Sequence, residues 1–323
     1  MALMFCSCSS SSNEDIKKEK VALLLPSSTM VSRWAVDANY LKNALLRYGF
    51  DVNLYQAEES ADGAKEQVKQ IKEAIDAGCG TLVITPIDYS VINEDGILEA
   101  NQDCNIICYD RMIMENPAID FYTTCDPSKI GEMQAQFLLN VAGNNNMEIE
   151  YFAGPKTDKN APTYFESAYG LLGANESFTV PSGKKSYSEV ALASWSAEDA
   201  KNAMTERLNG KSSLPDLILA PNDNVASGII EAIEESQLFT GTYPVITGQD
   251  MSDEAKNNIK AGKQAMTIYK EYEDLAETTA MVVSCFISGK PVITSNTFDN
   301  GRVKVPAKYT SFTLVTVHNI GQY

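Results

Sequence analysis

The sequence predicts an α/β protein of two doubly wound domains, each with a parallel sheet covered by helices on both faces. Near-continuous apolar runs, typical of buried parallel strands, alternate along the chain with apolar residues at helical spacing. The 323 residues, 44% of them hydrophobic, suffice for two cores. One sheet holding all these strands would be unusually wide, so we expect two sheets in two domains.

Strands are predicted at the apolar runs, which include Val21–Leu25, Val52–Tyr55, Leu82–Thr85, Ile106–Tyr109, Phe121–Thr124, Ile149–Phe152, Leu217–Ala220, Val245–Thr247 and Met266–Tyr269. Helical spacing between them is clearest in three stretches: Trp34, Ala38, Leu41, Leu45 and Tyr48; Ala64, Val68, Ile71 and Ile75; and Leu275, Thr279, Val282 and Phe286. No low-complexity linker separates the domains, which indicates several short crossings between them.

Charge and composition exclude several classes of function. The net charge of -17 repels phosphate backbones, so nucleic acid is not an expected partner. The single histidine, His318, leaves no basis for most zinc sites or for catalysis by an internal histidine base. None of the seven cysteines forms a C-x-x-C pair. We therefore expect no metal and no cofactor.

The first twenty residues are typical of a lipoprotein processing site. An apolar stretch at Met1–Phe5 is followed by Cys-Ser-Cys and then by Ser9–Ser12. We interpret residues 1–20 as a signal remnant and a Ser-rich linker, with Cys8 (or Cys6) as the lipidated residue. The lipid would be the only contact with a membrane. The alternative is an unprocessed, disordered N-terminus.

Polar side chains follow almost every predicted strand. Because ligands of open α/β sheets bind beyond the carboxyl ends of the strands, these side chains should converge on one site. They are Arg33, Asp88, Asp110, Arg111, Asp126, Asn222, Asp223, Asp250 and Lys270. Asp126, Asp223 and Asp250 also suit helix N-caps, but capping does not explain the two arginines or the lysine.

This mixture of side chains indicates a ligand rich in hydroxyl groups. Carboxylates and amide oxygens accept hydrogen bonds from hydroxyls, while Arg, Lys and Asn donate hydrogen bonds to them. A phosphate site would instead need glycine-rich turns, and no G-x-G-x-x-G is present. Trp34 and Trp195 stand at strand-to-helix junctions, where an indole could stack on the apolar face of a sugar. Core packing is the alternative for both.

Eight short segments of the chain are typical of one group of proteins. The matching segments are Ser32–Trp34, Val83–Asp88, Ile107–Arg111, Tyr122–Asp126, Asp158–Ala161, Ala220–Asp223, Gly248–Asp250 and Ile268–Lys270. With them, the chain resembles the periplasmic pentose/hexose-binding proteins of sugar ABC transporters, especially the xylose-binding and multiple-sugar-binding branch of type I periplasmic binding proteins. It departs from the pattern at Cys125–Pro127 and at Lys159, which leaves the identity of the sugar open.

The resemblance implies two doubly wound domains joined by a hinge of three crossings, with a monosaccharide in the cleft. It places Arg33, Asp88, Asp110, Arg111 and Asp126 on the first side of the sugar, Asn160, Asn222, Asp250 and Lys270 on the second, and Trp34 and Trp195 as stacking faces. We expect the first domain at residues 20–124 plus 252–294 and the second at 125–251 plus 295–323.

The expected function is capture of an aldopentose or aldohexose, xylose-like, by hinge closure, followed by delivery to an ABC permease. The protein would act as a monomer outside the cytoplasm, lipid-anchored at the cell surface or in the periplasm, and would catalyse no reaction. A receptor that feeds a sensor kinase or chemoreceptor remains an alternative. So does a glycoside-cleaving enzyme that uses Asp88 and Asp110. A repressor effector domain would need a basic helix-turn-helix, which residues 1–20 do not contain.

Overall fold

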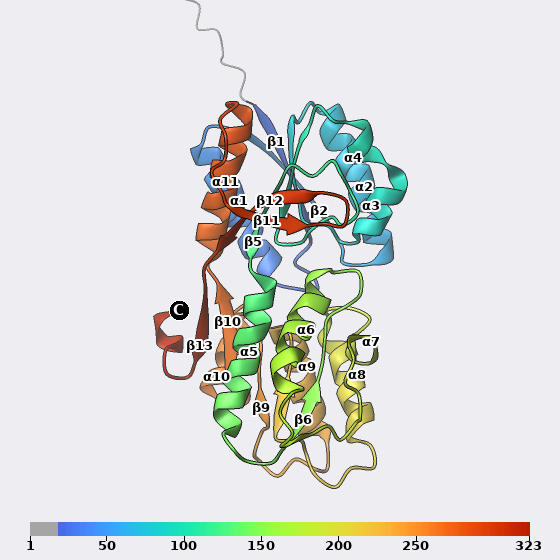
Figure 1. Cartoon of the computed structure of the whole chain (residues 1–323), viewed down its shortest axis with the longest axis vertical. Coiled ribbons are helices and arrows are strands. Elements are labelled where there is room, and N and C mark those ends of the chain that lie inside the picture. The colour runs from blue at the N-terminus through green and yellow to red at the C-terminus, as the bar shows by residue number, and fades with distance from the viewer. Residues whose placement is uncertain (1–18) are drawn as a thin grey trace, which may run out of the picture.

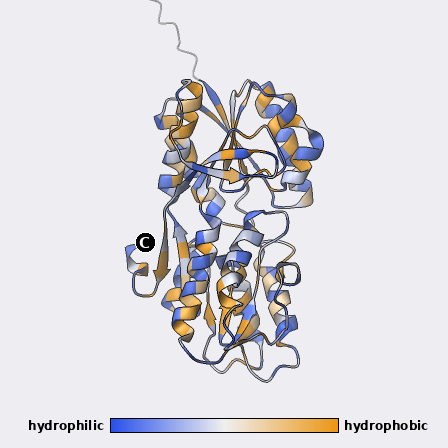
Figure 2. Cartoon of the chain, viewed as in Figure 1, coloured by the Kyte–Doolittle hydropathy of each residue, from blue (hydrophilic) through white to orange (hydrophobic). Residues whose placement is uncertain are grey.

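A computed structural model describes residues 19–323, so Cys6 and Cys8 and their predicted lipidation lie outside the described part of the chain. The chain forms two α/β units stacked along the long axis of the molecule (Figure 1). Many helices carry hydrophobic and hydrophilic residues in alternation, as expected for helices that cover a sheet on one side (Figure 2). Within residues 19–323, no helix combines the length and apolar character that crossing a bilayer requires.

The first unit contains a seven-stranded sheet in the order β11-β12-β5-β4-β3-β1-β2, parallel except for β11. Its strands are β1 (Lys20–Pro26), β2 (Asp51–Ala57), β3 (Thr81–Ile84), β4 (Asn105–Tyr109), β5 (Phe121–Cys125), β11 (Asn296–Asp299) and β12 (Lys304–Thr310). Its helices are α1 (Arg33–Arg47), α2 (Ala61–Asp76), α3 (Tyr89–Asp95), α4 (Ile97–Ala100) and α11 (Tyr272–Ile287).

Both faces of this sheet are buried, which explains its continuous apolar runs. In β1, Val21, Leu23 and Leu25 pack against α1 and α11, whereas Ala22 and Leu24 pack on the side of α2. Successive side chains of a strand point to opposite faces, so a strand covered on both sides must be apolar at every position.

The second unit holds a four-stranded parallel sheet, β7-β6-β8-β9, beside an antiparallel pair, β10-β13. Its strands are β6 (Met147–Tyr151), β7 (Phe178–Thr179), β8 (Leu217–Leu219), β9 (Val245–Ile246), β10 (Met266–Lys270) and β13 (Phe312–Thr316). Its helices are α5 (Pro127–Ala142), α6 (Asn160–Leu172), α7 (Tyr187–Val190), α8 (Ala197–Leu208), α9 (Asp223–Glu235), α10 (Asp253–Lys260) and the 3-10 turn η1 (Ile320–Gln322). Helices α5 and α6 cover one face of the sheet, and α8 and α9 cover the other.

The chain passes between the units three times, and the three crossings lie side by side. β5 enters α5 at Cys125, β10 enters α11 at Glu271, and β12 enters β13 at Ser311. The Cys125 Sγ lies 3.4 Å from the Thr310 Oγ1 and 3.6 Å from the Ser311 carbonyl oxygen. The Glu271 N–H donates to that same carbonyl at 3.4 Å. Three adjacent crossings make the hinge that the fold class predicts.

The sheets correct the expected domain boundaries at two places. β12 pairs in parallel with β5, so residues 296–310 belong to the first sheet instead of the second domain. β10 joins the second unit, because Met266 and Ile268 pack with α8 and α9. The predicted strands correspond to β1–β6 and β8–β10, whereas β7, β11, β12 and β13 were not predicted. β7 has two residues, β11 and β12 carry polar residues at exposed positions, and β13 has only one buried position.

Close packing of α5 on α6 positions two residues of the interdomain region, Asn160 and Tyr164, on the first turns of α6. The contact depends on Gly131 in α5. A Cβ atom there would lie 2.2 Å from the Tyr164 carbonyl oxygen and 2.3 Å from the Ser167 Oγ. The two helices therefore approach more closely than any residue with a side chain would permit.

We predict that Gly131→Ala lowers the free energy of unfolding by about 1–3 kcal/mol, because the added methyl forces α5 away from α6. The matched control is Gly170→Ala in α6, where nothing lies within 4 Å of the added Cβ. That control should be neutral or stabilising by up to about 1 kcal/mol, because alanine favours a helix over glycine. Urea unfolding measures both, and equal effects of the two substitutions would contradict this packing.

Candidate functional site

A narrow cavity lies between the two units, at the carboxyl ends of their strands, with about 270 Å³ of space between atoms that is partly open to solvent. Its lining comes from segments far apart in the sequence: Val31, Arg33, Trp34, Asp110, Arg111, Asp158, Tyr164, Trp195, Asn222, Gln249, Asp250 and Lys270. Ten of these twelve residues are polar, charged or tryptophan, and all are buried. Parallel sheets in each unit aim their loops at the same interface, which is why the polar side chains converge there.

A cluster of ion pairs forms the centre of this cavity. The Asp110 Oδ1 accepts from the Arg33 Nη2 at 3.0 Å and from the Lys270 Nζ at 3.1 Å. The Asp250 Oδ1 lies 3.2 Å from the Arg33 Nη1 and 3.8 Å from the Lys270 Nζ. Arg33 and Asp110 come from the first unit, whereas Asp250 and Lys270 come from the second. Paired charges of both signs thus join the units directly.

Three cations stabilise the ionised carboxylate of Asp110. Burial raises its pKa, but the charges of Arg33, Lys270 and Arg111 outweigh burial and hold the pKa well below its ordinary value. Its backbone has a φ of 61°, which is uncommon for a residue with a side chain. The Asp110 carbonyl accepts from the Tyr122 hydroxyl at 2.7 Å and from the Asn160 Nδ2 at 2.8 Å. These bonds hold the unusual turn in place.

Two buried residues, Asp37 and Tyr109, hold the Arg33 side chain in place. Its Nε donates to the Asp37 Oδ2 at 2.9 Å, one helical turn further along α1. The Tyr109 hydroxyl donates to the other carboxylate oxygen of Asp37, which has no solvent exposure. With Nε fixed by Asp37, the two Nη groups point to Asp110 and Asp250. Asp37 and Tyr109 are therefore positioning residues for the guanidinium.

Arg111 forms a second link between the units. Its Nη2 lies 2.7 Å from the Glu59 Oε1 of the first unit, and its Nε lies 2.8 Å from the Asp158 Oδ2 of the second. Although this ion pair is close, the Nε–H makes no hydrogen bond within residues 19–323. Such a buried donor is costly unless a further acceptor satisfies it.

The two tryptophans lie on either side of the cavity. That a sugar ring stacks on either indole stays a prediction. The Trp34 ring lies 4.4 Å from the Arg33 guanidinium carbon and 5.1 Å from that of Arg111. Its Nε1 donates to Glu59 at 3.3 Å. The Trp195 indole packs on Gly154, where a Cβ would come within 2.1 Å of the ring. The Trp195 Nε1 is buried and has no partner within the described residues.

Most of the predicted binding residues meet in this cavity. Eight line it: Arg33, Trp34, Asp110, Arg111, Trp195, Asn222, Asp250 and Lys270. Asn160 lies just behind, with its amide on the Asp110 carbonyl. Asn222 also caps α9, because its Oδ1 accepts from the Val225 N–H at 3.0 Å. Their contact with a ligand stays a prediction.

Asp88 and Asp126 need correction, because the structure places neither in the cavity. The Asp88 Oδ1 accepts from the Ser90 N–H at the start of α3, and the Asp126 Oδ1 accepts from the Ser128 and Lys129 N–H groups at the start of α5. Both are helix N-caps, so their carboxylates serve the local backbone. Asp88 lines a neighbouring groove instead.

Sequence reasoning missed Glu59, Asp158, Tyr164 and Gln249. Glu59 follows β2, and the rule applied to the other strand ends would have found it there. Gln249 directly precedes Asp250, and Tyr164 lies one helical turn beyond Asn160 on α6. Asp158 precedes α6 and was noted only as part of a matching segment. The pairing of Asp158 with Arg111 across the cleft is not visible from the sequence.

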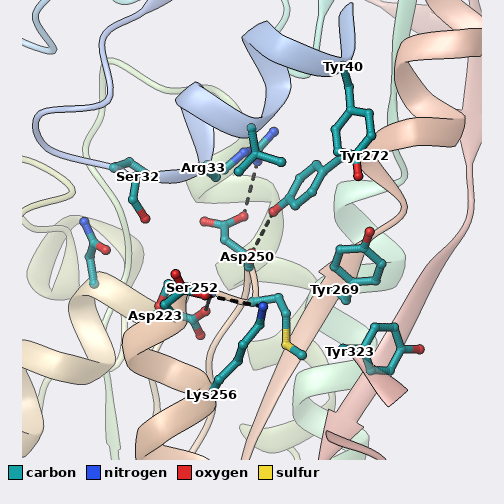
Figure 3. A pocket seen from close by; sticks show the side chains of 15 residues that line it. Ser32, Arg33, Tyr40, Asp223, Asp250, Ser252, Lys256, Tyr269, Tyr272 and Tyr323 are labelled. Carbon is teal, nitrogen blue, oxygen red and sulfur yellow. Dashed lines mark hydrogen bonds and ion pairs between the residues drawn. The ribbon is translucent and has the colours of Figure 1, made fainter. Parts of the chain in front are cut away.

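A second pocket lies on the other side of the Arg33–Asp250 pair, lined by Tyr40, Tyr269, Tyr272 and Tyr323 (Figure 3). Asp223 lies at its edge and accepts from the Ser252 N–H, Gln264 and Thr267. Burial, with the nearby charge of Asp250, raises the pKa of Asp223 to about 7. Asp223 is thus not the cap of α9 that the sequence suggested. It anchors the loop that carries Asp250.

The side chains that line the cavity are of the kinds that form hydrogen bonds with hydroxyl groups. Three cations and three carboxylates line it, so it offers donors and acceptors in close alternation: Arg33, Arg111 and Lys270, with Asp110, Asp158 and Asp250. Among residues 19–323 no group of three or more His, Cys, Asp or Glu side chains is arranged to hold a metal ion.

The amino-acid sequence is similar to those of several known proteins. Residues 21–291 match the model of the periplasmic binding protein domain. The chain is 29% identical over 305 residues to the multiple sugar-binding periplasmic receptor ChvE of Rhizobium radiobacter, which covers 90% of this chain and 84% of the relative. It is 32% identical over 265 residues to the D-xylose-binding periplasmic protein of Escherichia coli, covering 81% and 77% of the two chains.

A solved structure of an ABC transporter solute-binding protein from Clostridium phytofermentans, with bound β-D-glucose, is 27% identical. It superposes with a TM-score of 0.88 over 94% of this chain and 96% of that one. Its two-domain α/β fold confirms the predicted fold class. The relatives are named as binding proteins and as a receptor, which confirms the expectation of a protein that is not an enzyme. From the match over residues 21–291, the chain belongs to the family of periplasmic binding proteins.

Proposed function

We propose that this protein captures a neutral monosaccharide, an aldopentose or aldohexose, in the cavity between its two units. The observation that carries the proposal is the cluster of Arg33, Asp110, Asp250 and Lys270, in which both units supply cations and carboxylates at hydrogen-bonding distance. Hydroxyl groups can replace these partners one for one, donating to the carboxylates and accepting from the cations. The relatives named for xylose, glucose and multiple sugars support this class of ligand.

Capture would proceed by hinge closure. The three adjacent crossings let the units rotate relative to each other, and a ligand that contacts both units favours the closed form over the open one. In the closed form, Arg111 of the first unit reaches Asp158 of the second. The sugar would therefore be enclosed by groups that separate again when the cleft opens.

The protein would work outside the cytoplasm and deliver its sugar to an ABC permease, as the family and its solute-binding neighbours suggest. We keep the N-terminal lipid anchor and the monomeric state as parts of this proposal. Sensing remains a second candidate, because one relative is named as a receptor. The two roles share the binding site and differ only in the membrane partner.

Titration calorimetry with the full chain tests the binding step. We expect micromolar or tighter binding of at least one sugar among xylose, arabinose, ribose, glucose, galactose and fucose, because the paired charges form strong hydrogen bonds with hydroxyls. The absence of heat and of a melting shift with all six sugars would contradict the proposed function.

Replacing Lys270 by methionine tests the central cluster. Lys270 is 1% exposed, and its loss removes a donor and leaves Asp110 and Asp250 with less compensating charge. We expect Lys270→Met to weaken the sugar at least tenfold, which corresponds to about 1.4 kcal/mol. Lys263→Met is the control, because Lys263 forms an exposed pair with Glu234. Unchanged affinity in Lys270→Met would show that the cluster does not hold the sugar.

Asp158→Asn tests the closure of the cleft separately from direct contact with the sugar. It keeps the shape of the side chain and its bond to the Asn160 N–H, but it removes the charge that faces Arg111 across the cleft. We expect the sugar to dissociate about tenfold faster in stopped-flow measurements, because the closed form loses a buried ion pair. Asp62→Asn, which alters an exposed pair with Lys65, should leave the rate unchanged. Equal rates in all three proteins would argue against a role of Asp158 in closure.

A further inference from the structure

A groove adjoins the cavity in which we place the sugar ring. It holds about 660 Å³ of empty space, part of it open to solvent, compared with about 270 Å³ in the cavity itself. The first unit lines it with Glu59–Ala61, Ile87 and Asp88, and the second with Pro155, Thr157 and Ala193–Trp195. Like the cavity, it lies between the two units and would form only when they close.

The groove and the cavity share two lining residues, Arg111 and Trp195. Both are 5% exposed, so the boundary between the two spaces is made of buried side chains. Both also carry an N–H without a hydrogen-bond partner within residues 19–323, the Arg111 Nε and the Trp195 Nε1. Two unsatisfied buried donors on one boundary favour a ligand that brings acceptor oxygens to it.

The walls of the groove suit a second ring or a similar flat group. Its base is apolar and buried, with Ile87, Pro155 and the Trp195 indole. Its rim is exposed and carries small residues, among them Ser60, Ala61, Thr157 and Ala193. An apolar platform with hydroxyls at the edge is the surface on which a sugar or aromatic ring can lie.

From this we infer that the protein binds glycosides as well as free sugars, with the sugar ring in the Arg33–Asp250 cavity and the group on its anomeric oxygen in the groove. The glycosidic oxygen and its neighbours would then accept from the Arg111 Nε or the Trp195 Nε1. This inference rests on the proposed function and names a larger class of ligand for the same site. No bond is broken, so the glycoside would be bound and released intact.

Calorimetry of the full chain with six ligands tests the inference: glucose, xylose, and the 4-nitrophenyl α- and β-glycosides of each. We expect at least one glycoside to bind with a dissociation constant within tenfold of that of its parent sugar. A parent sugar that binds while all four glycosides fail would overturn the inference and leave the proposed function intact. Failure of all six, together with failure of arabinose, ribose, galactose and fucose, would overturn both.

Filling the groove distinguishes it from the cavity. Ala193→Trp and Ala61→Trp place an indole at the rim from opposite units, and Ala193→Ser is the control of matched position. We expect each tryptophan variant to weaken the glycoside at least tenfold while changing the affinity for the parent sugar less than twofold. Retained binding of the parent sugar also shows that the variant is folded. The glycoside does not occupy the groove if both tryptophan variants weaken the glycoside and the parent sugar equally. The same holds if neither variant weakens either ligand.

Discussion

The contact on which the site depends is the buried ion cluster around Asp110. Isolated charges in such a place would be strongly unfavourable, since removal from water costs several kcal/mol per ion. Here Asp110 faces both Arg33 and Lys270, and Arg33 reaches on to Asp250. Each unit contributes both signs of charge, and the Arg33–Asp250 and Lys270–Asp110 pairs link one unit to the other. The same pairing that makes burial tolerable also couples the position of one unit to that of the other.

The surrounding structure serves to place these few groups. Asp37 and Tyr109 fix the guanidinium of Arg33, and Asp223 fixes the loop of Asp250. Two cluster residues, Asp110 and Asp250, have positive φ angles of 61° and 99°. Such backbone is unfavourable for residues with side chains and persists only where neighbours hold it. The fold thus stores local strain at the cleft, where it turns both carboxylates toward the ligand space.

The fold class follows from the sequence, because parallel strands buried on both faces leave continuous apolar runs. The domain boundaries do not, since only long-range pairing decides that β12 joins β5. The polar residues at strand ends also predict where the site lies, but they do not predict which of them line it. Asp88 and Asp110 both follow strands, yet Asp88 begins a helix and caps it, whereas a turn at Asp110 directs its carboxylate inward. Asp158 was missed because its importance comes from Arg111, a partner on the opposite unit.

The central claim is that a sugar occupies the cavity by exchanging hydrogen bonds with this cluster. A crystal structure of the protein grown with the best-binding monosaccharide tests that claim most directly. The account predicts one sugar ring between the units, with hydroxyls at hydrogen-bonding distance from the carboxylates of Asp110 and Asp250 and from the amine of Lys270. A sugar bound elsewhere, or held by one unit alone with the cluster unchanged, would contradict it.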